Sequence, residues 1–293
     1  MSESKGRWLA VIPVAFVLIW STGFIVAKLA VPHAPPLTFL LLRFAGVMAV
    51  LLPVAIVMAA PWPRGAVAWG RVAVAGILLQ AIYLGGVWAA IALGMPAGVS
   101  ALIVGAQPLL TAVFAASVGE RVGPRHWAGL LLGFGGIALV LSDRLTLSGA
   151  GPLALAVNLL ALLGITAGTL WQKRHGAAVD LRTGTLIQFA ASFVVLLPFA
   201  LAFETPRIEF VWEFWLALAW SVFALSIVAI FLLLLMIRRG RATQVASYMY
   251  LTPPTTALMA WLAFDEKLGL AAWAGIALTM AGVALVVRPG KTS

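Results

Sequence analysis

Two basic side chains stand inside long apolar runs of this sequence, where a charge is costly. Lys28 lies in the run 8–31 and Arg43 in the run 37–58. An unpaired cation at the centre of such a helix costs about 3 kcal/mol on insertion scales. Arg43 lies roughly 10 Å into its helix at 1.5 Å per residue, and Lys28 is near enough to its helix end to reach the membrane surface. Two interpretations fit both residues: they snorkel or bond helix-end carbonyls, or they hold the carboxylate of a bound anion.

Acidic side chains are absent from the interior of the apolar runs. All nine Asp and Glu lie between the runs or at their edges. Carboxylates within the membrane commonly carry protons or Na⁺ in coupled pumps. The placement of the acidic residues at the run edges therefore favours a uniporter or an exchanger. Proton coupling through a group other than a carboxylate is the alternative. The chain also has no cysteine and no Ser/His/Asp or HExxH arrangement. We therefore predict no catalytic residues, no metal and no cofactor, so the protein is not expected to be an enzyme.

Nucleotide-driven transport is also not expected. The tail Gly290-Lys291-Thr292 resembles the end of a P-loop, but the first glycine of that motif would fall at Leu285. No helix can follow the tail to complete the phosphate site. The sequence implies no ATP-binding subunit.

Ten apolar runs are long enough to position these residues across a membrane. The composition is 63% hydrophobic and 10% charged, whereas soluble domains hold about 25% charged residues. A helix of about 20 apolar residues crosses the hydrocarbon core. We therefore predict an all-α integral membrane protein with ten transmembrane helices, in contact with the lipid bilayer. The runs cover residues 8–31, 37–58, 71–92, 97–118, 125–142, 152–173, 183–203, 213–237, 243–264 and 270–288.

The basic residues predict which side each loop faces. Cytoplasmic loops of membrane proteins carry an excess of Lys and Arg. With the N-terminus inside, three of the 19 basic residues fall in outside loops, namely Arg144, Arg207 and Lys267. The net charge of +10 therefore reflects orientation rather than nucleic-acid binding, and we expect both termini in the cytoplasm. The inside segments hold Lys5, Arg7, Arg64, Arg71, Arg121, Arg125, Lys173, Arg174, Arg182, Arg238, Arg239, Arg241, Arg288 and Lys291.

An internal repeat divides the chain into two halves, 1–146 and 147–293. Residues 98–141 match 244–287 without a gap at 12 of 44 positions, and 20–55 match 165–200 at 11 of 36. Each half holds five predicted helices, and five is odd, so the second half enters the membrane from the opposite side. Two inverted five-helix repeats are typical of secondary transporters that work by alternating access, with the substrate site between the halves.

The fourth and ninth predicted helices are interrupted at matching places, by Pro108 and by Pro254. A proline removes a helix hydrogen bond and frees the carbonyl four residues earlier, here those of Val104 and Tyr250. Such carbonyls need a polar cavity or a protein partner at membrane depth. The interruptions are therefore either structural kinks or part of a binding site.

The repeat carries a motif that resembles the drug/metabolite transporter superfamily. The copies read Glu-Arg-Val-Gly-x3-Trp-Ala-Gly from Glu120 and Glu-Lys-Leu-Gly-x3-Trp-Ala-Gly from Glu266. The segment Trp-Ser-Thr-Gly from Trp20 and the Arg-Phe pair at Arg43 also match. The resemblance covers essentially the whole chain and is greatest to bacterial inner-membrane exporters of amino acids and other metabolites, with the aromatic amino-acid exporters as a near group.

The resemblance implies where a substrate binds. In that superfamily the third, fourth, eighth and ninth helices surround a central cavity, which places five side chains of this sequence within reach of a substrate: Tyr83, Trp88, Gln107, Tyr248 and Tyr250. Trp171, Lys28 and Arg43 are further candidates for substrate binding. A deep aromatic residue such as Trp171 can also serve packing alone.

The sequence thus predicts an inner-membrane exporter of amino acids or related small metabolites. A drug or nucleotide-sugar carrier of the same superfamily is the first alternative. A membrane enzyme or a structural subunit is the second.

Overall fold

The computed structural model describes residues 2–30, 32–95, 100, 103–142, 151–176, 179–205, 207–239, 242–252, 254–256, 258–259 and 269–287, and all regular structure among them is helical. The long helices are α1 (Ser2–Ala30), α2 (Pro36–Val57), α7 (Pro124–Leu141), α8 (Pro152–His175), α9 (Leu181–Phe203) and α14 (Leu270–Val287). The shorter ones are α3 (Ala66–Gly76), α4 (Tyr83–Ala92), α6 (Gln107–Val113), α10 (Trp212–Trp220), α11 (Ala229–Arg239) and α12 (Ala242–Tyr248).

Six described helical stretches are long and apolar enough to cross a membrane, and a shorter apolar stretch covers Val11–Gly23. The six agree with the second, third, sixth, seventh, eighth and tenth predicted runs, and the short stretch lies in the first. The multi-pass helical architecture is therefore confirmed, and the count of ten remains a prediction. The six are Pro36–Val57, Ala66–Ala92, Pro152–His175, Leu181–Phe203, Trp212–Arg239 and Leu270–Val287.

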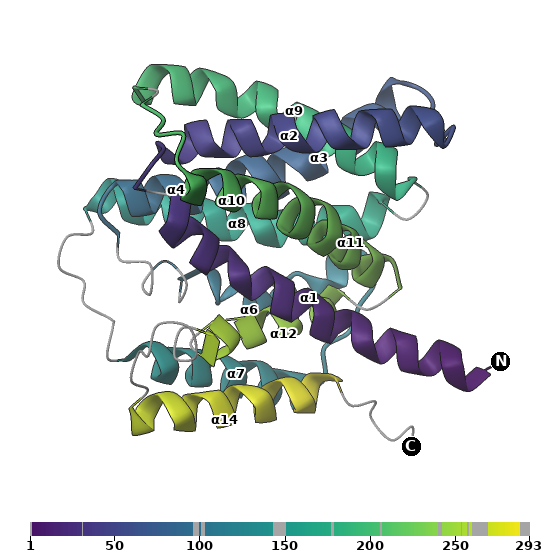
Figure 1. The fold of residues 1–293 in the computed structure, drawn as a ribbon. Helices are drawn as coiled ribbons and strands as arrows, with labels where there is room; N and C mark the ends of the chain where they lie inside the picture. Colours follow the sequence, from purple (N-terminus) through teal and green to yellow (C-terminus); the bar gives the residue numbers. More distant parts are fainter. Residues whose placement is uncertain are drawn as a thin grey trace.

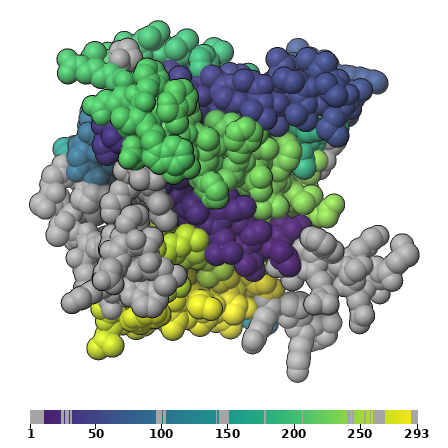
Figure 2. Space-filling model, in the orientation of Figure 1, coloured from purple at the N-terminus to yellow at the C-terminus, as the bar shows by residue number. Residues whose placement is uncertain are grey.

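Two helix pairs lie on opposite sides of the molecule (Figure 1): α2 with α9 on one side, and α7 with α14 on the other. The remaining helices lie between these pairs. In the space-filling view, α1 crosses the exposed face between α11 and α14 (Figure 2).

The pair α2–α9 meets at Phe44 and Phe189, whose rings pack edge to face with centroids 5.2 Å apart. Both rings are fully buried. The two residues occupy the same position in the two copies of the sequence repeat, which aligns 20–55 with 165–200. The repeats therefore touch each other through identical residues at equivalent places.

The pair α7–α14 is held together by glycines. A Cβ added at Gly129 would lie 2.7 Å from the carbonyl oxygen of Gly282, and one added at Gly136 would lie 2.7 Å from that of Gly275. The glycines of the fifth run therefore serve close helix packing. Gly129 and Gly275 are repeat equivalents, as are Gly136 and Gly282. Each glycine thus packs against the equivalent of the other, as in a two-fold symmetric interface.

Irregular helix interrupts the third and eighth predicted runs. A π-helical segment η1 (Ile77–Ile82) joins α3 to α4, and a second segment η4 (Ser221–Val228) joins α10 to α11. π-Helical segments are rare and occur often at functional sites. The two lie at about the same place in each half of the chain.

The predicted interruption of the fourth run is also present, and the ninth run is irregular just before its prolines. The chain turns at Gly105 and Ala106, and α6 begins at Gln107 with Pro108 in its first turn, where a proline is tolerated. In the ninth run, α12 is followed by the 3₁₀ segment η5 (Met249–Leu251), which directly precedes Thr252.

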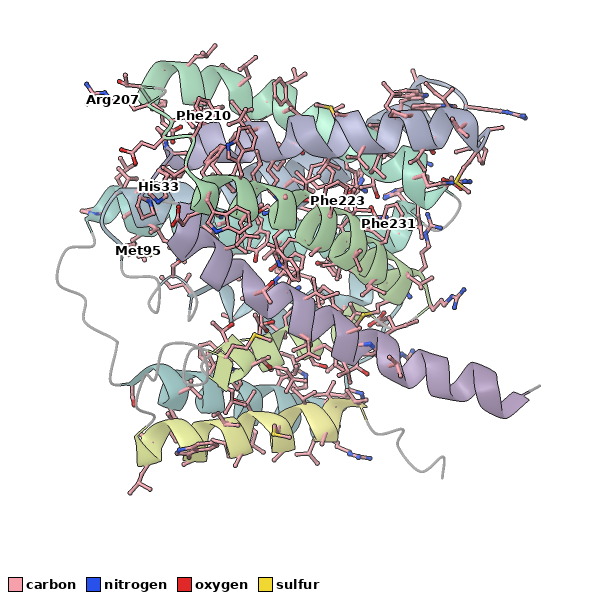
Figure 3. The ribbon with its side chains drawn as sticks, in the orientation of Figure 1. His33, Met95, Arg207, Phe210, Phe223 and Phe231 are labelled. Carbon is pink, nitrogen blue, oxygen red and sulfur yellow. The ribbon has the colours of Figure 1, made fainter. Side chains whose placement is uncertain are left out.

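Two sets of loops lie at opposite ends of the helices. His33, Met95 and Arg207 point from one end (Figure 3), where His33 Nδ1 lies 2.9 Å from a carboxylate oxygen of Glu209. At the same end, the Glu204 carboxylate accepts hydrogen bonds from the first backbone N–H groups of α2, at Leu37 and Thr38, each 2.7 Å long. α1 begins and α14 ends at the opposite end (Figure 1).

Candidate functional site

A small cavity lies at the centre of the helices, between elements from both halves of the chain. Its polar lining comes from Gln80 in η1, Tyr83 in α4, Gln107 in α6 and Thr169 in α8. Its volume is about 20 Å³, which is room for about one water molecule. The other lining residues are Trp20, Leu79, Ile165, Ile230, Leu233, Val245, Ala246 and Met249.

Gln107 and Gln80 are the amides of this cavity, and each is 2% exposed. The Gln107 Nε2 group donates a hydrogen bond to Thr111 Oγ1 at 3.1 Å, one turn further along α6. Thr111 Oγ1 in turn donates to the backbone carbonyl of Gln107 at 2.9 Å. The Gln107 Oε1 atom is buried without a partner in the described structure. A buried carbonyl oxygen without a donor is costly, so a ligand or a water at this atom would stabilise the site.

Arg43 lies behind Tyr83, close enough for electrostatic interaction between the two side chains. It is 5% exposed, and its Nε–H donates a hydrogen bond to Ser226 Oγ in η4 at 2.6 Å. No carboxylate forms an ion pair with Arg43 in the described part of the chain. The guanidinium is therefore buried well away from the helix ends, and it contacts the irregular segment of the eighth run rather than solvent.

Three of the other predicted site residues pack elsewhere. Trp88 stacks on Phe39 with ring centroids 5.6 Å apart. Tyr250 is 1% exposed and packs in the apolar cluster between α7 and α14, against Gly133. Tyr248 contacts the edges of two apolar clusters without lining the central cavity.

The last two predicted residues also lie away from the central cavity or beyond what is described. Trp171 lines a second, smaller cavity of about 10 Å³, where the end of α8 meets the start of α9. Its indole N–H donates to the Arg71 carbonyl at 2.8 Å. The Lys28 side chain and the second motif copy at Glu266 lie outside the described residues.

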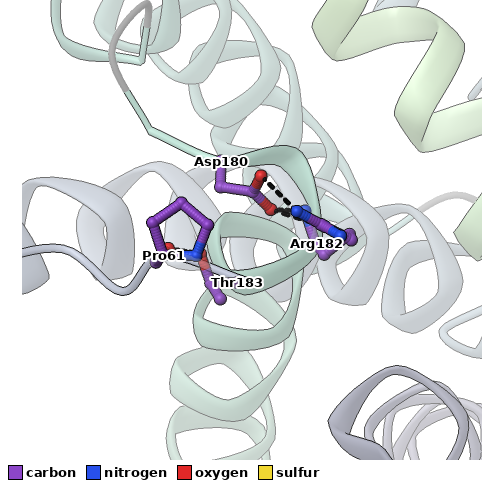
Figure 4. Close-up of polar contacts among 4 residues, drawn as sticks. All are labelled: Pro61, Asp180, Arg182 and Thr183. Atoms are coloured by element: carbon purple, nitrogen blue, oxygen red, sulfur yellow. Dashed lines mark hydrogen bonds and ion pairs between the residues drawn. The ribbon is translucent and has the colours of Figure 1, made fainter. Parts of the chain in front are cut away.

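The second cavity is bordered by a charged helix start (Figure 4). Arg182 donates from Nε and from its terminal nitrogen to the Asp180 carboxylate, both at 3.0 Å, and Thr183 Oγ1 donates to the Pro61 carbonyl at 2.8 Å. These hydrogen bonds from Arg182 hold the pKa of the Asp180 carboxyl below its ordinary value. Asp180 thus stays ionised at the N-terminus of α9, where negative charge is favoured.

Glu120 of the repeat motif has a structural role. One of its carboxylate oxygens accepts hydrogen bonds from the backbone N–H and the hydroxyl of Thr243, at 3.2 and 3.0 Å. Thr243 lies in the first turn of α12, so a loop of the first half caps a helix of the second half.

Sequence reasoning had not placed Gln80 in the site. A single glutamine in a long apolar run is a usable signal, but the run gives no sign of a π-helix, which decides the face on which Gln80 lies. Trp20, Thr169 and Met249 also line the cavity, and Trp20 belongs to the Trp-Ser-Thr-Gly segment noted in the sequence. The described residues contain no cluster of His, Asp and Glu suited to a metal ion.

Comparison with known proteins adds a family and a fold. The model of the EamA-like transporter family matches residues 7–142 and again residues 152–288. The fold is similar to that of a protein of known crystal structure, with a TM-score of 0.79 and 22% identity over 95% of this chain and 96% of the other.

The curated relatives are named as transporters rather than enzymes. An uncharacterized inner membrane transporter of Escherichia coli, YedA, is 26% identical over 93% of this chain and 88% of its own length. The Bacillus subtilis transporter YvbV is 26% identical over 94% of this chain and 90% of its own. A "probable amino-acid metabolite efflux pump" of E. coli is 27% identical over 59% of this chain and 55% of its own.

Proposed function

We propose, from the premise that this chain belongs to the EamA-like transporter family, that it exports amino acids or related small metabolites across a bacterial inner membrane by alternating access. The observation that carries this proposal is the central cavity, where Gln80, Tyr83, Gln107 and Thr169 bring polar groups together deep inside apolar helices. Convergent polar groups in an otherwise apolar site are typical of small-molecule binding. The name of the E. coli efflux pump supports the substrate class.

Two inverted halves, 1–146 and 147–293, are part of the proposal. The contact of Phe44 with Phe189 and the crossed glycine contacts of α7 and α14 support a two-fold relation between the halves. The family model also matches once within each half. Halves related in this way can exchange conformations, which opens a central site to one side and then to the other.

The cavity is too small for an amino acid in the present conformation, since its 20 Å³ suits about one water. Substrate must therefore enter after helices around it move apart. The irregular segments η1 and η5, which contribute to the lining, and η4, which directly precedes α11, are suited to such movement, because their hydrogen bonding already departs from that of an α-helix.

The proposed substrate contacts differ in whether they line the central cavity. Tyr83 and Gln107 line the cavity directly, and Arg43 acts on the substrate carboxylate from behind Tyr83. Trp88, Trp171, Tyr248 and Tyr250 would reach a substrate only after a rearrangement. Lys28 remains a proposed substrate contact. Among the described residues, none that lines the cavity is acidic, which supports uniport or exchange rather than coupling through a carboxylate.

Substrate counterflow in liposomes that contain only this protein tests the function. Vesicles loaded with an unlabelled amino acid are expected to accumulate the labelled form transiently, without ATP or an ion gradient. The panel includes a nucleotide sugar and a cationic drug, which represent the alternative substrate classes of the superfamily. Counterflow of the nucleotide sugar alone would replace the amino-acid assignment, and the absence of any counterflow would overturn the proposal.

Orientation gives a separate prediction. The single-cysteine variants Arg64→Cys and Arg239→Cys are expected to react with a membrane-impermeant maleimide only after the inner membrane is opened, because both positions lie in predicted cytoplasmic segments. Arg207→Cys is the matched control and should react in intact cells from the periplasmic side. The chain has no native cysteine, so no background labelling arises. Ready labelling of position 64 or 239 in intact cells would contradict the ten-helix topology.

A further inference from the structure

The central cavity offers a hydrogen-bond acceptor that nothing in the described structure uses. Gln107 is held with its Nε2 group on Thr111, and this bond fixes which end of the amide faces that threonine. Its Oε1 atom remains buried and without a partner beside the cavity. A carbonyl oxygen accepts hydrogen bonds and cannot donate them. The atom is therefore suited to a donor group of the substrate, such as an ammonium.

The charges around the cavity disfavour a second positive group. The residues that line it carry no formal charge at neutral pH, and the buried guanidinium of Arg43 lies behind Tyr83. Arg43 balances one carboxylate, and an amide oxygen can accept from one ammonium. A second cation on a substrate would meet no acidic partner in a site of low dielectric, where an unpaired charge is costly.

The rest of the lining provides space for an uncharged side chain. Six apolar residues from four different parts of the chain face the cavity, namely Leu79, Ile165, Ile230, Leu233, Val245 and Met249. The indole of Trp20 lies among them. The cavity therefore combines one buried acceptor without a partner, a cation outside the lining and an apolar wall.

We propose that Gln107 determines the charge selectivity of this transporter: its Oε1 atom accepts a hydrogen bond from the ammonium group of the substrate, and the cavity selects neutral amino acids with apolar side chains over cationic ones. The inference rests on the proposed amino-acid transport and adds the identity of the selective residue. In the unmodified protein, leucine counterflow is therefore expected to exceed lysine counterflow by about tenfold or more.

The decisive variant is Gln107→Glu, which changes the charge at nearly constant shape. The added negative charge lowers the cost of bringing a second cation into this site of low dielectric. The ratio of lysine to leucine counterflow should rise by about tenfold or more over the parent. Unchanged selectivity in a folded Gln107→Glu protein would overturn the inference.

Gln188→Glu is the matched control. Gln188 is also a glutamine at 2% exposure with an unpartnered Oε1 atom, but it lines the second cavity and donates from Nε2 to Gln172 at 3.0 Å. The same substitution there should leave the lysine-to-leucine ratio at the parent value. An equal rise in both variants would show a general effect of added negative charge and would contradict a specific role for Gln107.

A third variant, Gln107→Met, removes the acceptor and keeps the length of the side chain. Leucine counterflow should fall by about tenfold, the cost of one lost hydrogen bond to a charged group. The unmodified protein also tests the inference without any substitution. Equal counterflow of leucine and lysine by the parent would overturn the charge selectivity and leave amino-acid transport intact, whereas no counterflow of either would overturn the proposed function itself.

Discussion

Replacing Gly136 by alanine is expected to lower the thermal stability of the purified protein markedly. The added Cβ would lie 2.6 Å from the Thr279 backbone nitrogen and 2.7 Å from the Gly275 carbonyl oxygen. Both are backbone atoms of α14 and cannot rotate away, so α7 and α14 must separate. Overpacking of this kind costs about 1–3 kcal/mol. The change is measured as the melting temperature in detergent, followed by tryptophan fluorescence.

Gly135→Ala is the control at the neighbouring position. Its Cβ would meet nothing closer than Leu278 Cδ2 at 4.0 Å, which is ordinary contact. Both substitutions gain the same helix propensity, about 1 kcal/mol in alanine's favour. Gly135→Ala should therefore be neutral or slightly stabilising. Equal melting temperatures for the two variants would contradict the close packing of α7 against α14.

Arg43→Gln is expected to reduce amino-acid counterflow by about 10- to 100-fold, the effect of losing hydrogen bonds from a charged group. The physical reason is the loss of a buried guanidinium that can hold a carboxylate through two parallel N–H groups. Folding should survive, because a glutamine, Gln188, occupies the equivalent place in the second repeat and is buried there. Counterflow at saturating and at limiting substrate measures the loss of transport. Size-exclusion chromatography tests whether the variant is folded.

Ser226→Ala separates the two roles open to Arg43. It removes the acceptor of the 2.6 Å hydrogen bond from Arg43 Nε and keeps the charge. If Arg43 acts on the substrate, this variant should retain most of the transport that Arg43→Gln loses. If both variants lose transport equally, Arg43 instead positions the π-helical segment η4, and its assignment to the substrate carboxylate is wrong.

The parts of the fold that follow from hydropathy and from small residues could be predicted from the sequence. Long apolar runs predicted the six strongly apolar helices, because a membrane span requires an unbroken apolar stretch. The glycines that the two repeat copies share are a sequence signal for the close packing of α7 and α14, because only a missing Cβ lets two backbones approach to that distance. Pro108 and the turn before it likewise agree with the predicted interruption.

The direction of individual side chains could not be predicted in the same way. Tyr250 points into the cluster against Gly133 and Tyr83 lines the cavity, yet both are tyrosines in long hydrophobic runs without a clearly polar face. Hydrophobic periodicity separates inside from outside only when one face of a helix is polar. The π-helical segments also change the face of the helix on which a side chain lies, and residue types do not reveal this change. Gln80 lies in such a segment and could not be assigned to the cavity for that reason.

The partnership of α7 with α14 also sets an order of events during synthesis. The glycine face of α7 is complete when residue 141 has been made, but its partner surface ends at Val287, almost at the end of the chain. At about 5–20 residues per second, the ribosome needs roughly 7–30 s to supply it. Until then the exposed groove of α7 is open to lipid or to another unfinished chain. A nascent chain that stops before α14 is therefore expected to be a target for membrane quality control. Its helix α7 then has no partner helix to pack against.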